Sequence, residues 1–531
     1  MNLLLDPWIP IRRTDGSQSH ISPWQITEVN NPIVEIDAPR ADFQGALYQF
    51  LIGLLQTVIA PSEDEEWQEH WEVPPSPELL KEKFNQISEV FELENSNGPA
   101  FLQDLRLKEG ERKPLAALLI ESPGSNTLKE NKDFFVKRGA IEHVCESCTI
   151  SALFTLQTNA PSGGSGHRVG LRGGGPLTTL ILPQTQHSTL WQKLWLNILP
   201  SDNETVPSTI SGPDPQVLPW VEDTRLSDKT GHSTTPEDVN LLQAYWGMPR
   251  RIRLDQAEKT EKYCDICGQL ALKVYRSFIT KNYGINYEGP WQHPLTPYSY
   301  DLKNKKPPLS IKGQKGGLGY RHWLGLTLQN EDGSKQAAFN VRNFNDLIND
   351  YLDGDQQARL WCFGYDMDNM KARCWYEQTF PLFIIKSEKK RGFIQTAVEE
   401  ILEIAIEAVS TLKSQVKAAW FRRPKDVKGE LSAVDQSFWE QTENVFYDLL
   451  FQLNKYDDAV KKIPPEIAEI WWKTVTKSVF GLFDQWTLEA NPEDLDLAAI
   501  MKSRKDLKNK INKTKIFKNF KSRFEKREAE A

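Results

Sequence analysis

Two Cys-x-x-Cys pairs constrain the fold of this chain more than any other feature of its sequence. The first pair is Cys145 and Cys148 in "CESC", and the second is Cys264 and Cys267 in "CDIC", which precedes Gly268. This spacing lets both sulfurs of a pair face one ion, and tetrahedral zinc takes four such thiolates. We therefore expect a structural Zn²⁺ that joins two segments distant in the sequence. Four buried thiols, or a redox pair at one motif, are the alternatives.

Other sequence features indicate a cytoplasmic protein with no membrane partner. Six cysteines in 531 residues do not suggest a secreted disulfide scaffold, and we expect Cys362 and Cys374 to be core residues. The N-terminus, "MNLLLDPWIPIRR", lacks the long apolar run and the cleavage site of a signal peptide. The most apolar window, residues 46–60, contains Gln49 and Gln56 and is too short to span a bilayer.

The N-terminal part of the chain mixes helical and extended patterns. Residues 41–60 predict a buried helix that ends before Pro61, and "SEDEEWQEHWE" predicts an acidic, solvated helix. The apolar runs "KPLAALLIES" and "GPLTTLILPQ" predict buried strands, and "FNVRNF" predicts a strand or a short core segment. The two prolines of "PWIPIRR" predict an edge strand or a turn.

The pattern becomes helical near Arg391. Apolar residues recur at helical spacing in residues 394–416, 438–453 and 467–482, and a fourth helix is expected after Asn491-Pro492. Short links favour an antiparallel four-helix bundle over a coiled coil. The predicted fold class is α+β, with a large mixed N-terminal domain, held by the zinc site, at residues 1–385. The C-terminal four-helix bundle occupies residues 386–531.

The last helix carries a dense positive charge. Residues 502–527 contain twelve Lys or Arg, opposed by Asp506 and Glu525 alone, although the whole chain has a net charge of −8. The net charge argues against a uniformly basic nucleic-acid coat but permits a local patch. The run is therefore either a solvated helix or a phosphate-binding surface.

The sequence does not predict an enzyme. It has no Walker motif, no H-E-x-x-H and no G-x-S-x-G. Asp366 and Asp368, in "GYDMDNMKAR", are candidate ligands for a divalent ion. A metal nuclease would need a further acidic partner, and none is identified.

An unusual amount of glycine occurs beside positive charge in "NAPSGGSGHRVGLRGGGPLTT", residues 159–179. Seven of the fourteen residues from Ser162 to Gly175 are glycine. His167, Arg168 and Arg172 lie among them and are candidates to hold phosphates. A flexible lid or linker is the alternative.

Several segments, in a fixed order, resemble one family. They are "LLLDPWIPIRR", "FFVKRG" before "CESC", the glycine stretch, "NYGINYEGPWQHPLTPY" and "GYDMDNMKARCWYE". This combination resembles the CasA family, the large subunit of the type I-E CRISPR surveillance complex Cascade, over the whole chain. The resemblance implies a non-catalytic subunit in antiviral defence, which recognises the PAM in double-stranded DNA, starts R-loop formation and recruits a helicase–nuclease.

The resemblance also implies three PAM-reading elements. Gly163, Gly164, Ser165 and Gly166 match the glycine loop, which approaches the minor groove with bare backbone. Lys281 matches the lysine finger, with Lys273 as the alternative. The wedge that separates the strands matches Asp368, Asn369 and Met370, and either Asn369 or Met370 is the inserted side chain. For the lysine finger, the competing interpretation is an ordinary surface lysine. For the wedge, it is a helix cap formed by Asp366 or Asp368.

"FFVKRG" matches the loop that contacts the 5′ handle of the crRNA. Phe134 would stack on a nucleotide, while Lys137 and Arg138 would hold phosphates. The alternative interpretation is that Phe134 is an aromatic core residue. The implied partners are the crRNA, double-stranded target DNA, the helicase–nuclease and the other Cascade subunits, which are the backbone, handle-binding, small and crRNA-processing subunits.

Two other functions remain open from the residues alone. One is a zinc-containing RNA-binding protein with no DNA role. The other is a nuclease that uses Asp366 and Asp368.

Overall fold

The structure is a computed structural model of the full chain. It describes residues 1–133, 136–185, 187–202, 206–228, 231–303, 306–313, 316–329, 333–348, 358–368, 371–383, 385, 387–426, 431–457, 460–489 and 496–525. The chain forms two compact units. The first comprises Met1–Lys315 and Ala337–Leu382, and the second comprises Gly316–Gln336 and Phe383–Ala531. The domain division at 385/386 remains a prediction, and the sequence did not indicate that residues 316–336 group with the C-terminal helices.

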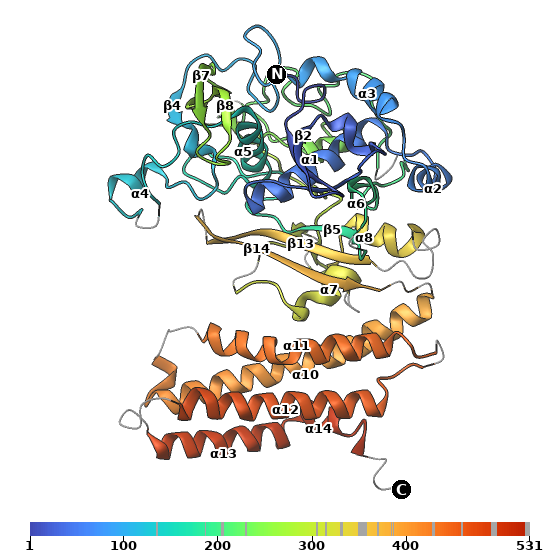
Figure 1. The fold of residues 1–531 in the computed structure, drawn as a ribbon. Helices are drawn as coiled ribbons and strands as arrows, with labels where there is room; N and C mark the ends of the chain where they lie inside the picture. The colour runs from blue at the N-terminus through green and yellow to red at the C-terminus, as the bar shows by residue number, and fades with distance from the viewer. Residues whose placement is uncertain are drawn as a thin grey trace. The chain divides into compact units, whose positions relative to one another are not determined.

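The first unit mixes helices with antiparallel strands, as expected for an α+β fold (Figure 1). Its α-helices are α1 (Ala41–Val58), α2 (Asp64–Glu72), α3 (Pro77–Asn85), α4 (Ser125–Lys129), α5 (Glu146–Asn159), α6 (Leu190–Trp195) and α8 (Phe339–Asn343). Its 3-10 helices are η1 (Pro23–Thr27), η2 (Ser88–Val90), η3 (Leu115–Leu118) and η4 (Leu241–Trp246), and η6 (Phe344–Ile348) is a π-helix.

The strands of this unit form several small sheets. They are β1 (Ile9–Arg13), β2 (Gln18–Ile21), β3 (Ile33–Ile36), β4 (Glu111–Pro114), β5 (Thr178–Pro183), β6 (Arg251–Leu254), β7 (Glu258–Tyr263), β8 (Leu270–Val274), β9 (Ser277–Lys281), β10 (Tyr298–Asp301), β11 (Lys306–Ser310), β13 (Ala358–Asp368) and β14 (Lys371–Leu382). The strand orders are β2-β1-β3, β4-β9-β6, β14-β13-β5 and the pair β7-β8.

Helix α1 is buried on nearly all sides, which explains why its sequence is apolar around the whole helix. Its Gln56 is satisfied by the backbone of Leu199, whose N–H donates to Oε1 and whose oxygen accepts from Nε2, each at 2.9 Å. Helices α5 and α6 pack against α1. The predicted helices at residues 41–60 and in the acidic run are thus confirmed as α1 and α2.

Aromatic side chains from distant segments fill the core of this unit. Phe50 of α1 contacts Trp8, Phe101, Phe154 and Trp246 at ring-centroid distances of 5.4 to 5.8 Å. All four contacts are edge-on, the geometry that ring quadrupoles favour.

Local patterns failed where tertiary packing decided the conformation. The strand predicted in "KPLAALLIES" ends at Pro114, and a 3-10 helix buries Leu115 and Leu118 instead. "FNVRNF" begins the helix α8. Strand β1 is the middle strand of its sheet, so the prediction of an edge strand was wrong. The strand predicted in "GPLTTLILPQ" is confirmed as β5.

The second unit is mainly helical (Figure 1). Its elements are η5 (Tyr320–His322), α7 (Trp323–Thr327), β12 (Lys335–Gln336), α10 (Glu388–Trp420), η7 (Pro424–Asp426), α11 (Ser432–Leu453), α12 (Pro465–Leu488), α13 (Leu497–Lys513) and α14 (Lys515–Lys521). Helix α10 packs against α11, α12 and α13. Its predicted apolar stripe, residues 394–416, is buried. Asn491-Pro492 lies outside the described residues, and α13 begins at Leu497 with Asp496 as its cap.

Among the described residues, no helix is both long enough and apolar enough to cross a membrane.

Candidate nucleic-acid interface and metal centre

The predicted glycine loop lies in the connection between α5 and β5. Gly164 and Ser165 are exposed, while Gly163 and Gly166 are half-buried. Gly166 has a φ of +78°, a conformation that side chains with a Cβ rarely adopt. The sequence at this position therefore suits a tight loop that presents backbone at the surface.

The turn after β9 holds this loop in place. The N–H of Tyr283 donates to the oxygen of Gly166 at 2.8 Å, and the amide of Asn282 donates to the oxygen of Ser165 at 2.7 Å. The hydroxyls of Tyr283 and Ser165 are 3.3 Å apart. Lys281, the exposed last residue of β9, directly precedes these two residues. The structure thus brings the glycine loop and the first-choice lysine close together.

The alternative lysine lies elsewhere. Lys273 is on β8 and pairs with Glu146 at 3.5 Å. Glu146 begins α5, whereas the glycine loop follows the other end of this 14-residue helix. The helix is about 20 Å long. This separation favours Lys281 as the residue that acts with the loop.

The glycines of the stretch serve two different purposes. A Cβ on Gly164 would have no atom within 4 Å, so packing does not require glycine there. A Cβ on Gly170 would lie 2.7 Å from the oxygen of Thr158, and one on Gly175 would lie 2.6 Å from Cγ of Met367. The later glycines therefore permit close packing, which the sequence alone did not indicate.

Arg172 does not hold a phosphate, so that prediction was wrong. Its side chain is only 6% exposed, and its guanidinium donates to Gln49, Thr178 and Thr296 at 2.6 to 3.0 Å. Burial lowers the pKa of Arg172 to about 10, which leaves it charged at neutral pH. This residue anchors the glycine stretch to α1 and β5.

The other two basic residues of the stretch, Arg168 and His167, already contact other residues of the chain. The Arg168 guanidinium donates to the hydroxyl and the backbone oxygen of Ser227, at 2.7 and 2.6 Å, and lies 5.9 Å from the Tyr283 ring centre. Nδ1 of His167 contacts the Arg250 guanidinium. Burial, and then the charge of Arg250, lower the pKa of His167, so the imidazole is the neutral acceptor in this pair.

The segment predicted to form the wedge is a long β-hairpin. Strands β13 and β14 pair from Ala358 opposite Leu382 to Asp368 opposite Lys371. Asn369 and Met370 lie outside the described residues. The hairpin touches the glycine stretch near its turn, where Gly175 packs against Tyr365 and Met367, and the other end of β13 pairs with β5.

The two aspartates of this hairpin engage an arginine. Asp366 is buried and receives two hydrogen bonds from Arg373, at 2.7 and 3.0 Å, while Asp368 lies 3.7 Å from the same guanidinium. Both residues are in a strand, so the helix-cap alternative was wrong. A carboxylate that is already paired with a guanidinium is a poor divalent-ion ligand. Within the described part of the chain, only the cysteines form a cluster of three or more potential metal ligands.

The predicted crRNA-handle loop is described in part. Phe134 lies outside the described residues. Lys137 is exposed, and Arg138 donates to both oxygens of Asp133, at 2.6 and 2.7 Å, and to Asn131. The first of these hydrogen bonds lowers the pKa of Asp133. To hold a phosphate, Arg138 would first have to release Asp133. The exposed side chain of Lys137 could reach a phosphate without such a change.

The four cysteines of the two pairs meet in one cluster. Cys145 caps the start of α5, and Cys264 and Cys267 lie in the turn between β7 and β8, where Gly268 has a φ of +72°. All four sulfurs lie within 4.8 Å of one another, and those of Cys145 and Cys267 are 3.8 Å apart. Four sulfurs at 2.3 Å from one ion would be about 3.8 Å apart. The residues therefore fit a tetrahedral metal ion.

The electrostatics of the cluster favour thiolates at the second pair. Hydrogen bonds from Cys145 and Cys148 lower the pKa of Cys267 to about 7 and hold that of Cys264 below its usual range. Thiolates are the form that binds metals. Of the two cysteines predicted to be core residues, Cys362 is buried, whereas Cys374 on β14 is only half-buried.

Two residues of the candidate interface were missed from the sequence. Asn282 and Tyr283 hold the glycine loop, and Tyr283 has a φ of +66°, which is uncommon for an aromatic residue. The following Gly284 was the one signal in the sequence near these residues. In the structure it permits a close approach, because a Cβ there would lie 2.2 Å from the oxygen of Pro249.

Comparisons with known proteins match this chain to one family. The family model of CRISPR-associated protein Cse1 matches residues 2–482. Thermus thermophilus CasA (Cse1) has 18% identity and a TM-score of 0.67, covering 96% of this chain and 99% of that chain. Cse1 from Acidimicrobium ferrooxidans has 15% identity and a TM-score of 0.65, covering 99% of each chain. A chain of a CRISPR RNA-guided surveillance complex has 16% identity and a TM-score of 0.66, covering 96% of this chain and 99% of that chain.

The structural matches show a shared fold at low sequence identity, and the family match spans most of the chain. The resemblance inferred from the ordered motifs is confirmed. The chain belongs to the CRISPR-associated Cse1 (CasA) family.

Proposed function

We propose that this chain is the non-catalytic large subunit of a type I-E CRISPR RNA-guided surveillance complex, Cascade, and that it recognises the PAM in double-stranded DNA. Membership of the Cse1 family and the likeness to a chain of such a complex support the assignment. The guide RNA would read the target by base pairing, and this subunit would read only the short PAM. Its place of action would be the cytoplasm, in antiviral defence.

One observation carries the PAM-reading role: the contact between the glycine loop and the turn that follows Lys281. The minor groove is about 6 Å wide, so bare backbone can approach base edges that a branched side chain cannot reach. Exposed Gly164 and Ser165 would supply that backbone. The Lys281 ammonium would donate to the acceptors on the floor of the groove.

The β13–β14 hairpin would supply the wedge. Asp368 ends β13, Asn369 and Met370 follow it in the sequence, and the part of β13 just before Asp368 packs against the glycine stretch through Gly175. This contact would fix the hairpin relative to the loop that binds the PAM. Insertion between base steps costs a few kcal/mol per step, which the PAM contacts would offset as the R-loop starts.

The crRNA handle would contact the segment that precedes the cysteine cluster. Lys137 would hold a phosphate directly and Arg138 after leaving Asp133, while Phe134 would stack on a nucleotide. The cluster itself would hold a structural Zn²⁺. Four cysteine ligands leave no open coordination position for catalysis, so the ion would join the two cysteine segments rather than act on a substrate.

The helices of the second unit would form the C-terminal four-helix bundle of a domain at residues 386–531, after a mixed domain at residues 1–385. Lysines exposed on α13 and α14 would hold displaced or flanking DNA; they are Lys502, Lys505, Lys508, Lys510, Lys513, Lys515 and Lys518. The other Cascade subunits and the helicase–nuclease would be the protein partners.

A PAM library tests the proposal. The chain is assembled with its partner subunits and crRNA, and binding to duplex targets with every PAM is measured, together with a footprint on a preferred target. We expect a restricted set of PAMs, protection of the PAM and exposure of the displaced strand, with no cleavage by this subunit.

Three other outcomes would refute it. Equal binding to every PAM would contradict PAM recognition. RNA binding without any duplex footprint would support the zinc-containing RNA-binding protein. Metal-dependent cleavage that Asp366→Ala abolishes would support the nuclease.

A further inference from the structure

A small cavity lies inside the first unit. Its lining includes Gln49 of α1, Gln157 of α5, Arg172 of the glycine stretch, Tyr245 of η4 and His293. None of these residues is more than 6% exposed. The space open to the centre of a water-sized particle is about 10 Å³, which is enough for one water molecule or one ion of similar size.

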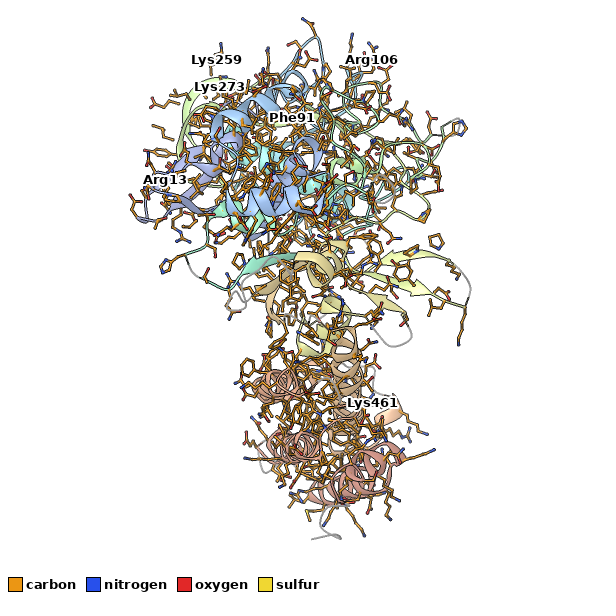
Figure 2. All side chains as sticks on the ribbon, turned by 90° about the vertical axis from the view of Figure 1, so that its right-hand side faces the viewer. Arg13, Phe91, Arg106, Lys259, Lys273 and Lys461 are labelled. Atoms are coloured by element: carbon orange, nitrogen blue, oxygen red, sulfur yellow. The ribbon has the colours of Figure 1, made fainter. Side chains whose placement is uncertain are left out.

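Arg172 places a positive charge at this cavity. It forms no ion pair with any carboxylate in the described part of the chain, and its hydrogen-bond partners are the neutral side chains of Gln49, Thr178 and Thr296. Exposed cations such as Lys259 lie at the edge of the unit, where water solvates them (Figure 2). A buried charge is costly unless an opposite charge compensates it, so the cavity favours an anion.

The Arg172 guanidinium keeps two N–H groups for an occupant. Nη1 donates to Thr178 and Thr296, and Nη2 donates once, to Gln49. The Thr178 hydroxyl also donates to Oε1 of Gln49 at 3.2 Å, so these two acceptors lie side by side on the edge between Nη1 and Nη2. Of the five N–H groups, the one on Nε and the second on Nη2 remain. They share the next edge and form the fork with which arginine grips an anion.

Two further donors belong to the lining. The buried hydroxyl of Tyr245 has no hydrogen-bond partner among the described residues, although buried polar groups are normally paired. Burial raises the pKa of Tyr245 and the charge of Arg172 opposes this rise, so the hydroxyl keeps its proton near the guanidinium. The ring of His293 lies 5.0 Å from that of Tyr245. Its Nδ1 accepts from Leu295, so Nε2 carries the proton of the neutral imidazole.

The amide oxygens of the lining are already occupied. Oε1 of Gln49 accepts from both Arg172 and Thr178. Oε1 of Gln157 accepts from the N–H of Arg250 at 2.9 Å. An occupant therefore meets a positive charge and unused donors. A water molecule has two hydrogens of its own to donate, so a small anion satisfies these groups better than water does.

We propose that this cavity binds one monovalent, chloride-sized anion, held by the free edge of the Arg172 guanidinium and by the hydroxyl of Tyr245. The ion neutralises the arginine that anchors the glycine stretch to α1 and β5, and so stabilises this part of the fold. A phosphate or a carboxylate is too large for the cavity. The inference is independent of the proposed function, because it requires neither nucleic acid nor another subunit.

Thermal unfolding of the full chain tests the inference. Chloride replaces the larger anion gluconate at constant ionic strength, so that screening of surface charges stays the same. For wild type we expect the midpoint to rise and then saturate, as it does when one site of the folded state binds a ligand. Tyr245→Phe removes the hydroxyl and keeps the ring, and it should need at least tenfold more chloride for the same rise. Tyr287→Phe, at a buried tyrosine of the same unit, is the matched control and should respond as wild type does.

Bromide locates the ion directly. A crystal of the wild-type chain soaked in bromide should show an anomalous peak in the cavity, beside the Arg172 guanidinium and the Tyr245 hydroxyl. The inference is overturned if the cavity holds only an ordered water, or nothing, at saturating bromide. It is also overturned if wild type and Tyr245→Phe respond equally to chloride. The bromide measurement needs no variant, so it decides the question even if Tyr245→Phe does not fold.

Discussion

Residues 163–175 use glycine in two ways, and each way predicts a different consequence of adding a side chain. Gly164 has open space around it and is exposed, so packing within the chain does not require glycine at this position. Gly175 has a φ of +60° and lies against Tyr365 and Met367, so its lack of a Cβ serves the fold.

Gly164→Val and Gly175→Ala should therefore separate binding from stability. Gly164→Val should change the free energy of unfolding by no more than about 0.5 kcal/mol and weaken PAM-dependent duplex binding. Gly175→Ala should cost about 1–3 kcal/mol of stability because of its strained backbone and steric overlap. Denaturant unfolding and duplex-binding assays measure the two effects. Unchanged duplex binding for Gly164→Val would contradict the proposed role of the loop.

His293 makes the fold sensitive to acid. It is buried, its Nδ1 accepts from the N–H of Leu295 at 3.1 Å, and burial lowers its pKa well below 6.5. Below pH 6.5 the unfolded chain binds a proton that the folded chain does not bind. The free energy of unfolding should fall by about 1.4 kcal/mol per pH unit from this residue, until the lowered pKa is reached.

His293→Gln retains an acceptor for Leu295 and removes this titration. Unfolding by denaturant at pH 7.0 and 5.0, for wild type and variant, should give a smaller pH dependence for the variant. The same pH dependence in both proteins would show that His293 contributes no linked proton.

At the scale of elements, the cysteine cluster joins α5 to the β7–β8 hairpin. A two-stranded hairpin is at best marginally stable by itself, so its conformation depends on what holds its ends. The cluster and the bonds of Asp265 supply that support. The metal would therefore stabilise one element rather than the whole unit.

Cys145→Ser/Cys264→Ser tests this dependence. Wild type should contain about one zinc per chain and the variant should contain none, because zinc needs all four thiolates of a closed site. The thermal midpoint should fall, and the hairpin should lose protection from hydrogen exchange. Cys374→Ser, outside the cluster, should retain the zinc. Equal zinc in the wild type and the double variant, by elemental analysis, would rule out these ligands.

At the scale of the whole molecule, our proposal assigns PAM recognition and strand separation to different segments of one unit. The glycine loop with Lys281 contacts the duplex in our proposal, and the tip of the β13–β14 hairpin opens it. Under this proposal both segments would act only while the target is double-stranded.

Lys281→Ala with Asn369→Ala should therefore weaken binding of the assembled complex to duplex DNA with a preferred PAM. Loss of a hydrogen bond from a charged group costs about 1.5–3 kcal/mol, or about 10- to 150-fold in affinity. Binding to a target that is already single-stranded should change much less. Lys81→Ala, at an exposed lysine of α3, is the control. Equal losses on both targets would defeat the assignment.

The sequence by itself determined the elements whose signal is local. The apolar period of residues 394–416 predicted α10, and the Cys-x-x-Cys spacings predicted which thiols would meet. Order and identity of short motifs were enough to indicate the family. Such signals depend on covalent spacing and helical periodicity, which are present before the chain folds.

Only the tertiary structure decided which residues of the glycine stretch remain accessible. From the sequence, Arg172 is expected to be a surface cation. It is buried instead, because Gln49, Thr178 and Thr296 come together around its guanidinium. Asn282 and Tyr283 carry no motif, and they matter because the turn after β9 lies against the loop. Contacts between segments more than a hundred residues apart depend on the folded backbone, so periodicity and spacing could not have predicted them.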